Sequence, residues 1–226
     1  MTTELLRNIS MSNRDIFKEI HSNTLIEPDI NLERFKWKEY ITSEFQRYPS
    51  SHKTNQERLF LTEYFHKQMY HENRILFHMT ITYRPYRDRI YRPKDVNTFF
   101  INFYTKYLLV NLLGTRKINK PHLRLIQPIT FTFIDEHSQD KFKKINQDGE
   151  YEYPDRLHHH SIISVHESNT SFFRRLREKN PFHPTHQYTK KILTSHIREC
   201  EPMTFLYVSK TMEKYPDYLC FPDRFH

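Results

Sequence analysis

The stretch Asp155-Arg156-Leu157-His158-His159-His160-Ser161-Ile162-Ile163-Ser164-Val165 decides how the chain is interpreted. It begins with polar residues and ends in an apolar run rich in β-branched side chains, which predicts a β-strand. Alternate side chains of a strand share a face, so His158 and His160 are expected to point the same way, roughly 7 Å apart at their Cα atoms. Two neutral imidazoles at this spacing can bind one divalent metal ion. In a chain with 15 histidines, the alternative is an accidental cluster at a polar strand edge.

The composition narrows the class of protein and of partner. With 226 residues, of which 18 are Phe and 15 are Tyr, the chain can bury a core of aromatic side chains. A net charge of +8 and a pI of about 9.3 favour a polyanionic partner, with nucleic acid ahead of a membrane. The only two glycines are Gly114 and Gly149, which excludes a P-loop and a dinucleotide-binding fingerprint. We therefore expect no nucleotide cofactor.

The cellular compartment is predicted from what the sequence lacks. Cys200 and Cys220 are the only cysteines, too few for a disulfide framework. The N-terminus has no hydrophobic signal segment, and the longest apolar stretch, 99–113, is too short and too polar to cross a bilayer. These features predict a protein of a reducing cytoplasm that does not contact a membrane.

The hydrophobic patterns divide the chain into two regions. Residues 1–72 are predicted to be a helical N-terminal region, either a cap on the second region or an arm that grips duplex DNA. Beyond residue 72, strands are predicted over 75–83, 127–134, the histidine stretch and 190–199, and helices over 95–113, 168–179 and 202–214. The resulting β-α-β-β-α-β-α order predicts an α+β, ferredoxin-like fold, in which an antiparallel sheet carries its helices on one face.

A basic loop follows the first predicted strand. Its cationic residues alternate with Tyr86 and Tyr91, a pattern that suits phosphate contacts combined with base stacking. The predicted DNA-binding residues are Arg84, Arg87, Arg89, Arg92 and Lys94. The alternative is a loop that is merely solvated.

The last predicted helix contains Tyr207 and Lys210, which are three residues apart and therefore share a helix face. A phenol hydroxyl can attack a phosphodiester when charge on the phosphate is neutralised, and Lys210 and a metal ion on the two histidines could both do this. The segment Tyr188-Thr-Lys-Lys191 repeats the motif, but Tyr188 precedes the last predicted strand. An ordinary helix face is the alternative for either copy.

Three motifs in this order resemble those of the HUH endonuclease superfamily, specifically the rolling-circle replication initiator (Rep) proteins of plasmids and phages. They are the apolar and threonine-containing strand over 77–83, the pair His158 and His160, and the pair Tyr207 and Lys210. The resemblance covers about residues 72–215. It implies that residues 73–226 form an endonuclease domain in which the two histidines bind Mg²⁺ or Mn²⁺, Tyr207 is the nucleophile and Lys210 supports it.

The chain departs from the pattern of this superfamily at the histidine motif. His159 stands where relatives usually have a bulky apolar residue, and it is expected to face away from the metal. Many relatives add a third ligand, often a carboxylate near the hairpin. Glu136, at the end of the neighbouring strand, is the preferred candidate here, and the other candidates are Asp135, Glu150 and Glu152.

The resemblance implies metal-dependent nicking and joining of single-stranded or hairpin DNA at a replication origin, through a 5′-phosphotyrosine, in the bacterial cytoplasm. No helicase domain follows in the sequence, so a host helicase and polymerase are the expected partners. One alternative is an HUH transposase or relaxase, although relaxases typically place the tyrosine before the histidines. Another is a non-catalytic ferredoxin-like module that binds nucleic acid through the basic loop.

Overall fold

The computed structural model of the chain describes residues 34–71, 73–84, 91–115, 120, 123, 126–136, 144–145, 151–152, 157–178 and 187–221. Within these ranges, a five-stranded antiparallel sheet has the strand order β6-β1-β5-β2-β7. The strands are β1 (Arg74–Tyr83), β2 (Ile129–Glu136), β5 (Leu157–His166), β6 (Ile192–Glu199) and β7 (Leu219–Phe221). Two short strands, β3 (Lys144–Ile145) and β4 (Tyr151–Glu152), pair only with each other. The histidine stretch is therefore the central strand of the main sheet.

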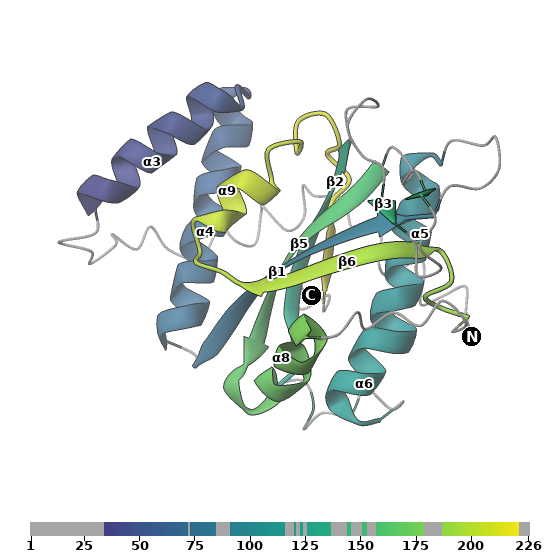
Figure 1. Cartoon of the computed structure of the whole chain (residues 1–226). Coiled ribbons are helices and arrows are strands. Elements are labelled where there is room, and N and C mark those ends of the chain that lie inside the picture. Colours follow the sequence, from purple (N-terminus) through teal and green to yellow (C-terminus); the bar gives the residue numbers. More distant parts are fainter. Residues whose placement is uncertain are drawn as a thin grey trace.

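Helices cover both faces of this sheet (Figure 1). One face carries α5 (Pro93–Phe103), which continues through the π-helical turn η1 (Tyr104–Leu108) into α6 (Leu109–Leu113). It also carries α8 (Thr170–Glu178), which follows the short 3₁₀-helix η2 (Glu167–Asn169). The other face carries α4 (His52–His71) and α9 (Thr204–Val208), with α3 (Arg34–Arg47) against α9. The protein thus has a mixed α+β fold, and its helices are not confined to the one face expected from the sequence.

The alternation of β1 explains why both faces are covered. Phe77, Met79, Ile81 and Tyr83 point into one apolar cluster, which the aromatic side chains of α5 and α8 complete. Leu76 points the other way, into a second cluster with side chains from β2, β5 and the helices α4 and α9. Because a sheet with apolar residues on both faces must bury both, each face recruits its own layer of helices.

Several boundaries differ from those expected. The closing helix was predicted to run to Lys214, but α9 ends at Val208 and the chain continues in turns. The hydroxyl of Ser209 donates to the carbonyl of Phe205 at 2.7 Å, and the guanidinium of Arg58 donates to the carbonyl of Leu206. Side chains therefore provide hydrogen-bond donors for backbone carbonyls at the end of α9. Strand β7 was not predicted. The helix expected over residues 1–33 lies outside the described residues. Among the residues that the structure describes, no helix is both long and apolar enough to cross a membrane.

His159 belongs to the core of the α5 face, on the side of the sheet opposite to His158 and His160. Its side chain is completely buried. The hydroxyl of Tyr83 donates to Nδ1 of His159 at 2.6 Å, and Nε2 of His159 donates to the side-chain oxygen of Asn97 at 2.9 Å. Burial, together with the neighbouring charges of His158 and His160, lowers the pKa of His159 to about 3. The imidazole is therefore a neutral link in a buried hydrogen-bond chain.

The first prediction concerns the pH dependence of stability. In the unfolded chain a histidine takes up a proton near pH 6.5, whereas folded His159 resists protonation down to about pH 3. Between these values the unfolded state binds more protons, so the free energy of unfolding falls as the pH is lowered, by about 1.4 kcal/mol per pH unit for one such group. Urea unfolding between pH 8 and pH 5 measures this dependence. In His159→Leu the free energy of unfolding should depend less steeply on pH, by the equivalent of about one proton.

The same variant should be less stable at pH 8 by about 1–3 kcal/mol, because the Tyr83 hydroxyl loses its buried partner. His166→Leu is the matched control, since this partly exposed residue ends the same strand. Equal pH slopes for His159→Leu and the unsubstituted protein would contradict the role of His159 as a neutral core residue.

Candidate metal centre

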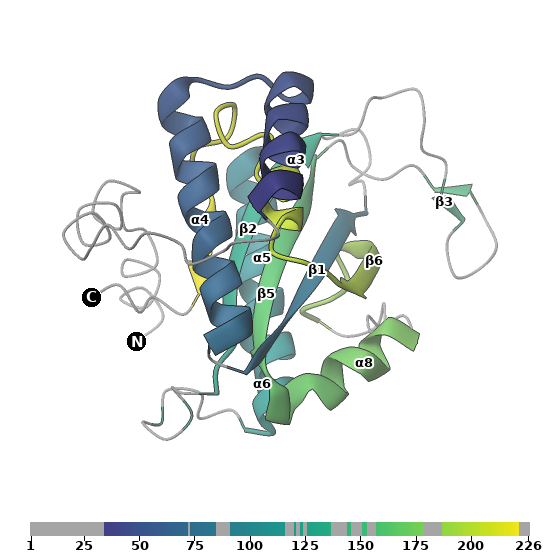
Figure 2. The ribbon, with the colours of Figure 1, turned by 90° about the vertical axis from the view of Figure 1, so that its left-hand side faces the viewer.

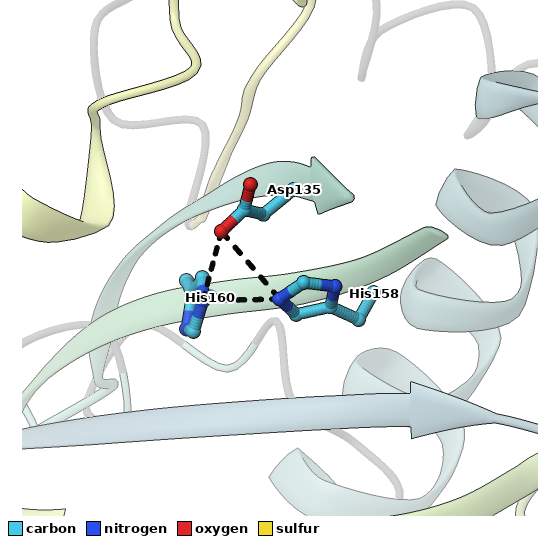
Figure 3. Close-up of side chains that lie close together, drawn as sticks. All are labelled: Asp135, His158 and His160. Carbon is cyan, nitrogen blue, oxygen red and sulfur yellow. Dashed lines mark hydrogen bonds and ion pairs between the residues drawn. The ribbon is translucent and has the colours of Figure 1, made fainter. Parts of the chain in front are cut away.

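Asp135, His158 and His160 converge on one point of the sheet (Figure 3). Nε2 of His158 lies 3.1 Å from Nε2 of His160. Asp135 Oδ2 lies 3.5 Å from the first of these nitrogens and 3.2 Å from the second. All three side chains are buried, with relative exposures of 5% to 7%. Three potential ligand atoms thus face one another in a space shielded from solvent.

The pairing of β2 with β5 creates this arrangement. Asp135 stands directly opposite His158 in the antiparallel register, so their side chains lie on the same face. His160 follows His158 by two residues and shares that face, while His159 points to the other. A register shift of one residue would exchange Asp135 for Glu136. The strand register therefore determines which carboxylate joins the histidines.

The residues fit a divalent metal ion. Mg²⁺ and Zn²⁺ hold oxygen and nitrogen ligands at about 2.0–2.2 Å, which places neighbouring ligand atoms roughly 3 to 3.5 Å apart. The three observed separations of 3.1, 3.2 and 3.5 Å fall in this range. Imidazole favours Zn²⁺, Fe²⁺ and related ions, whereas a carboxylate favours Mg²⁺ and Mn²⁺, so the ligand types alone do not select one metal. The group can hold an ion, whose identity is left to experiment.

Asp135 and His160 have the protonation states that metal binding requires. Although burial by itself would raise the pKa of Asp135, hydrogen bonds from His158 and His160 and the charge of Lys210 hold it well below its usual range. Burial lowers the pKa of His160 to about 4, against the opposing effect of Asp135. The carboxyl group is thus an anion and the His160 ring is neutral at pH 7, as metal ligands should be.

Tyr207 and Lys210 also lie at this site. The Tyr207 ring meets the His160 ring edge-on, with 5.4 Å between centroids. The ammonium of Lys210 lies 4.1 Å from the centre of the Tyr207 ring and forms an ion pair with Asp135. The backbone N–H of Lys210 donates to the Tyr207 carbonyl at 3.2 Å, so the two residues stay adjacent although α9 has ended. A phenol, a cation and three ligand groups therefore share one site.

Glu136, the carboxylate preferred from the sequence, lies away from the two histidines. Its side chain accepts from Lys214 at 2.9 Å and from the hydroxyl of Tyr215. Asp135, a less favoured candidate, occupies the position beside the histidines. Glu150 lies outside the described residues, and the structure describes only the backbone of Glu152. Asp135 rather than Glu136 lies beside the histidines because consecutive residues of β2 point to opposite faces and the strand register puts Asp135 opposite His158.

The basic loop is described only at its ends. Arg84, which is partly buried, follows β1, and its backbone N–H donates to the carbonyl of Lys191 at 2.8 Å. Arg92 and Lys94 are exposed at the start of α5, where Arg92 pairs with Asp95 at 3.6 Å. Arg87 and Arg89 lie outside the described residues. The proposed contacts of this loop with phosphate stay predictions.

Tyr188, the competing tyrosine, lies beside η1. The ammonium of Lys106 in η1 is 5.4 Å from the centre of its ring. Since η1 belongs to the helical layer on the α5 face, Tyr188 is placed with the face opposite to the metal ligands. The geometry therefore favours Tyr207 over Tyr188 as the tyrosine of the site.

His78 is a site residue that the sequence motifs did not single out. It lies on β1, and its Nε2 is 3.1 Å from Nδ1 of His160. Arg198 donates to its other nitrogen at 3.3 Å, and burial, with the charges of His160, Arg198 and Lys210, lowers the pKa of His78 to about 3. His78 shares a strand face with Thr80, and Thr80 stands opposite His160. The pairing of β1 with β5 is therefore the signal that could have identified His78 as a site residue.

His78 and Thr80 hold the outer side of the His160 ring. If His160 binds an ion through Nε2, its proton must reside on Nδ1, because a neutral imidazole carries only one. The hydroxyl of Thr80, 3.0 Å from Nδ1, can accept this proton. Nε2 of His78 lies 3.1 Å from Nδ1 but carries the proton of its own neutral ring, because Arg198 donates to the other nitrogen of that ring. His78 therefore contacts His160 by ring packing, with 5.2 Å between ring centroids. Partners of this kind fix the ring orientation of a metal ligand. They form the second layer of the candidate metal centre.

Comparisons with known proteins give no family for this chain. A scan against models of protein families, a search of curated proteins and a search of solved structures all found no match. The assignment of function therefore depends on the sequence motifs and on the geometry of the site.

The second prediction tests the ligand set. Asp135→Asn, His158→Ala and His160→Ala should each weaken the binding of Mn²⁺ at least about a hundredfold, because each removes one of three ligand groups. Isothermal titration calorimetry of the folded variants without DNA measures this directly. Glu136→Gln is the matched control, being the neighbouring carboxylate, and should bind Mn²⁺ as the unsubstituted protein does. A loss of binding in Glu136→Gln but not in Asp135→Asn would show that the register of β2 is wrong.

The third prediction tests the second layer. His78→Leu should weaken Mn²⁺ binding by about ten- to a hundredfold, since the His160 ring loses a partner that orients it. His78→Gln keeps a polar group at this position and should recover part of the affinity. The same calorimetric titration serves here, with His166→Leu as a control on a partly exposed histidine. Unchanged affinity in a folded His78→Leu protein would remove His78 from the site.

Proposed function

We propose that this protein is a metal-dependent enzyme that nicks and rejoins single-stranded DNA through a tyrosine, as the rolling-circle initiators of the HUH superfamily do. The convergence of Tyr207 and Lys210 with the two histidines is the observation that supports this function. Sequence motifs alone point to these residues, and they come from elements far apart in the chain. A shared location is not expected of unrelated motifs.

The sheet also supports a ferredoxin-like core, which we infer for this domain. Strands β1, β2, β5 and β6 correspond to the four strands of a β-α-β-β-α-β unit, with α5 and α8 as its two helices. Their order β6-β1-β5-β2 places the first and third strands at the centre, as expected for such a unit. Strand β7 and the helices α3, α4 and α9 are then additions to this unit.

In the proposed reaction, the Tyr207 hydroxyl attacks a phosphodiester of single-stranded DNA. A bond forms between the phenol oxygen and phosphorus, and the bond from phosphorus to the 3′ oxygen breaks. The phenol proton is lost and the leaving 3′ oxygen gains a proton, which gives a 5′-phosphotyrosine and a free 3′ hydroxyl. Attack by a 3′ hydroxyl on the phosphotyrosine reverses these steps and rejoins the strand. The covalent bond retains the energy for rejoining, so no nucleotide is consumed.

The residues of the site have separate roles in this proposal. Asp135, His158 and His160 would hold Mg²⁺ or Mn²⁺, which when bound supplies positive charge to the scissile phosphate. Lys210 brings a second positive charge beside the nucleophile. His78 and Thr80 orient the His160 ring. The basic loop between β1 and α5 would attract the DNA backbone, in line with the net charge of +8.

The fourth prediction tests the nucleophile. Tyr207→Phe removes the phenol oxygen and should reduce the protein–DNA adduct by more than about a thousandfold, while DNA affinity and Mn²⁺ affinity stay unchanged. The measurement incubates the protein with Mn²⁺ and single-stranded DNA from its own replicon, followed by a denaturing gel. Peptide mapping of the adduct then identifies the modified residue.

Tyr188→Phe and Tyr215→Phe are the matched controls and should both retain the adduct. DNA attached at either of these tyrosines would refute the assignment of Tyr207 while retaining covalent nicking. Nicking without an adduct would refute the mechanism. A non-catalytic DNA-binding module would show no metal-stimulated nicking with any of these proteins.

A further inference from the structure

Helices α3 and α4 pack against the segment that carries Tyr207. Helices α3 and α4 both contact α9, on the side of the sheet that bears the metal ligands (Figure 2). Phe65 of α4 packs on Phe205 of α9, with 5.3 Å between ring centroids. No sequence motif predicts a catalytic role for these helices.

Arg58 of α4 makes the most specific of these contacts. Its side chain is completely buried, which is unusual for arginine. Its guanidinium donates to the carbonyl of Leu206 at 2.5 Å and to the hydroxyl of Ser209 at 3.3 Å. It also donates to the side-chain oxygen of Asn55 at 3.2 Å and to the carbonyl of Tyr48 at 3.4 Å. One cation therefore joins α4, the end of α3 and the end of α9.

The backbone that Arg58 holds is that of the proposed nucleophile. Leu206 directly precedes Tyr207, and Ser209 directly follows α9. A helix of five residues has little stability of its own, and the carbonyls of its last turn have no partners within the helix. Hydrogen bonds from a buried cation to these groups fix the position of the segment and interact favourably with the helix dipole. The direction in which Tyr207 projects is thereby constrained.

Further contacts flank Tyr207 on the same side. The Tyr48 ring meets the Tyr207 ring edge-on at 6.3 Å and lies 5.9 Å from the ammonium of Lys210. The backbone N–H of Ser51 donates to Glu213 at 2.7 Å, beyond Lys210 in the chain. Helix α4 and the connection between α3 and α4 thus reach the segment carrying Tyr207 before, beside and after the tyrosine.

We propose that the hairpin of α3 and α4 is part of the catalytic site, and that Arg58 is a positioning residue that holds Tyr207 for attack on the scissile phosphate. This inference rests on the proposed function. It gives the N-terminal region a task that neither a passive cap nor a duplex-gripping arm would have. Arg58 acts through the backbone of α9, since its guanidinium donates to Leu206 and Ser209 rather than to the metal ligands.

The experiment compares full-length variants in single-turnover adduct formation with Mn²⁺ over a range of single-stranded DNA concentrations. Arg58→Met should lower the maximal rate by about a hundredfold, since misplacement of a reacting group by about 1 Å has an effect of this size. The half-saturating DNA concentration and the Mn²⁺ affinity should not change. Arg58→Lys restores the charge without the fork of donors and should recover part of the rate. Lys67→Met, which removes an exposed cation from the same helix, is the matched control and should have no effect.

Hydrogen exchange gives a readout that does not depend on nicking. In Arg58→Met, the amides of residues 205–210 should exchange at least about tenfold faster, while those of β5 keep their protection. If Arg58→Met does not fold, Ser209→Ala removes one Arg58 contact and decides the question by the same two measurements, with a rate decrease of about tenfold expected.

The outcomes distinguish this inference from the proposed function. The positioning role would be overturned, with Tyr207 still the nucleophile, if a folded Arg58→Met protein kept the original maximal rate. If Arg58→Met does not fold, an unchanged rate in Ser209→Ala would overturn the role in the same way. An equal loss of rate and of Mn²⁺ affinity would also overturn it, because the effect would then be a general loosening of the site. If the unsubstituted protein forms no adduct, the proposed function fails and the positioning role fails with it, whatever the exchange measurements show.

Discussion

The burial of β5 on both faces is the constraint on which the rest of this structure depends. A central strand with three consecutive histidines must supply polar partners on each side, because an unsatisfied buried polar group is costly. His159 finds them in Tyr83 and Asn97 beneath the α5 layer. His158 and His160 find theirs in Asp135 and Thr80 on the other face. The residues of the candidate metal centre therefore also provide the buried imidazoles of this strand with polar partners.

Much of this arrangement follows from local patterns in the sequence. The period of two in β1 and in the histidine stretch correctly separates His159 from its two neighbours. The motif order singled out Tyr207 and Lys210, which lie beside His160, whereas Tyr188 lies on the opposite face. The catalytic roles of Tyr207 and Lys210 stay predictions. These successes share a physical basis, since strand alternation and the spacing of three residues are fixed by backbone geometry.

The remaining features depend on contacts between distant segments, which one sequence does not specify. Asp135 and Glu136 are equally acidic neighbours, and only the register of β2 against β5 selects Asp135. His78 joins the site because β1 pairs on the other side of β5. The early end of α9 reflects hydrogen bonds from Arg58, a residue of a helix that precedes the sheet. The π-helical turn η1 likewise has no signal in the pattern that predicted one continuous helix over 95–113.

The ion pair between Lys210 and Asp135 has a consequence for the life of the protein in a cell. The chain itself provides a counter-charge for its buried carboxylate, so folding need not wait for a supply of metal. An ion bound by Asp135 and the two histidines would have to share this carboxylate with the ammonium of Lys210. The competition between lysine and metal for one carboxylate would then depend on how much metal the surroundings supply.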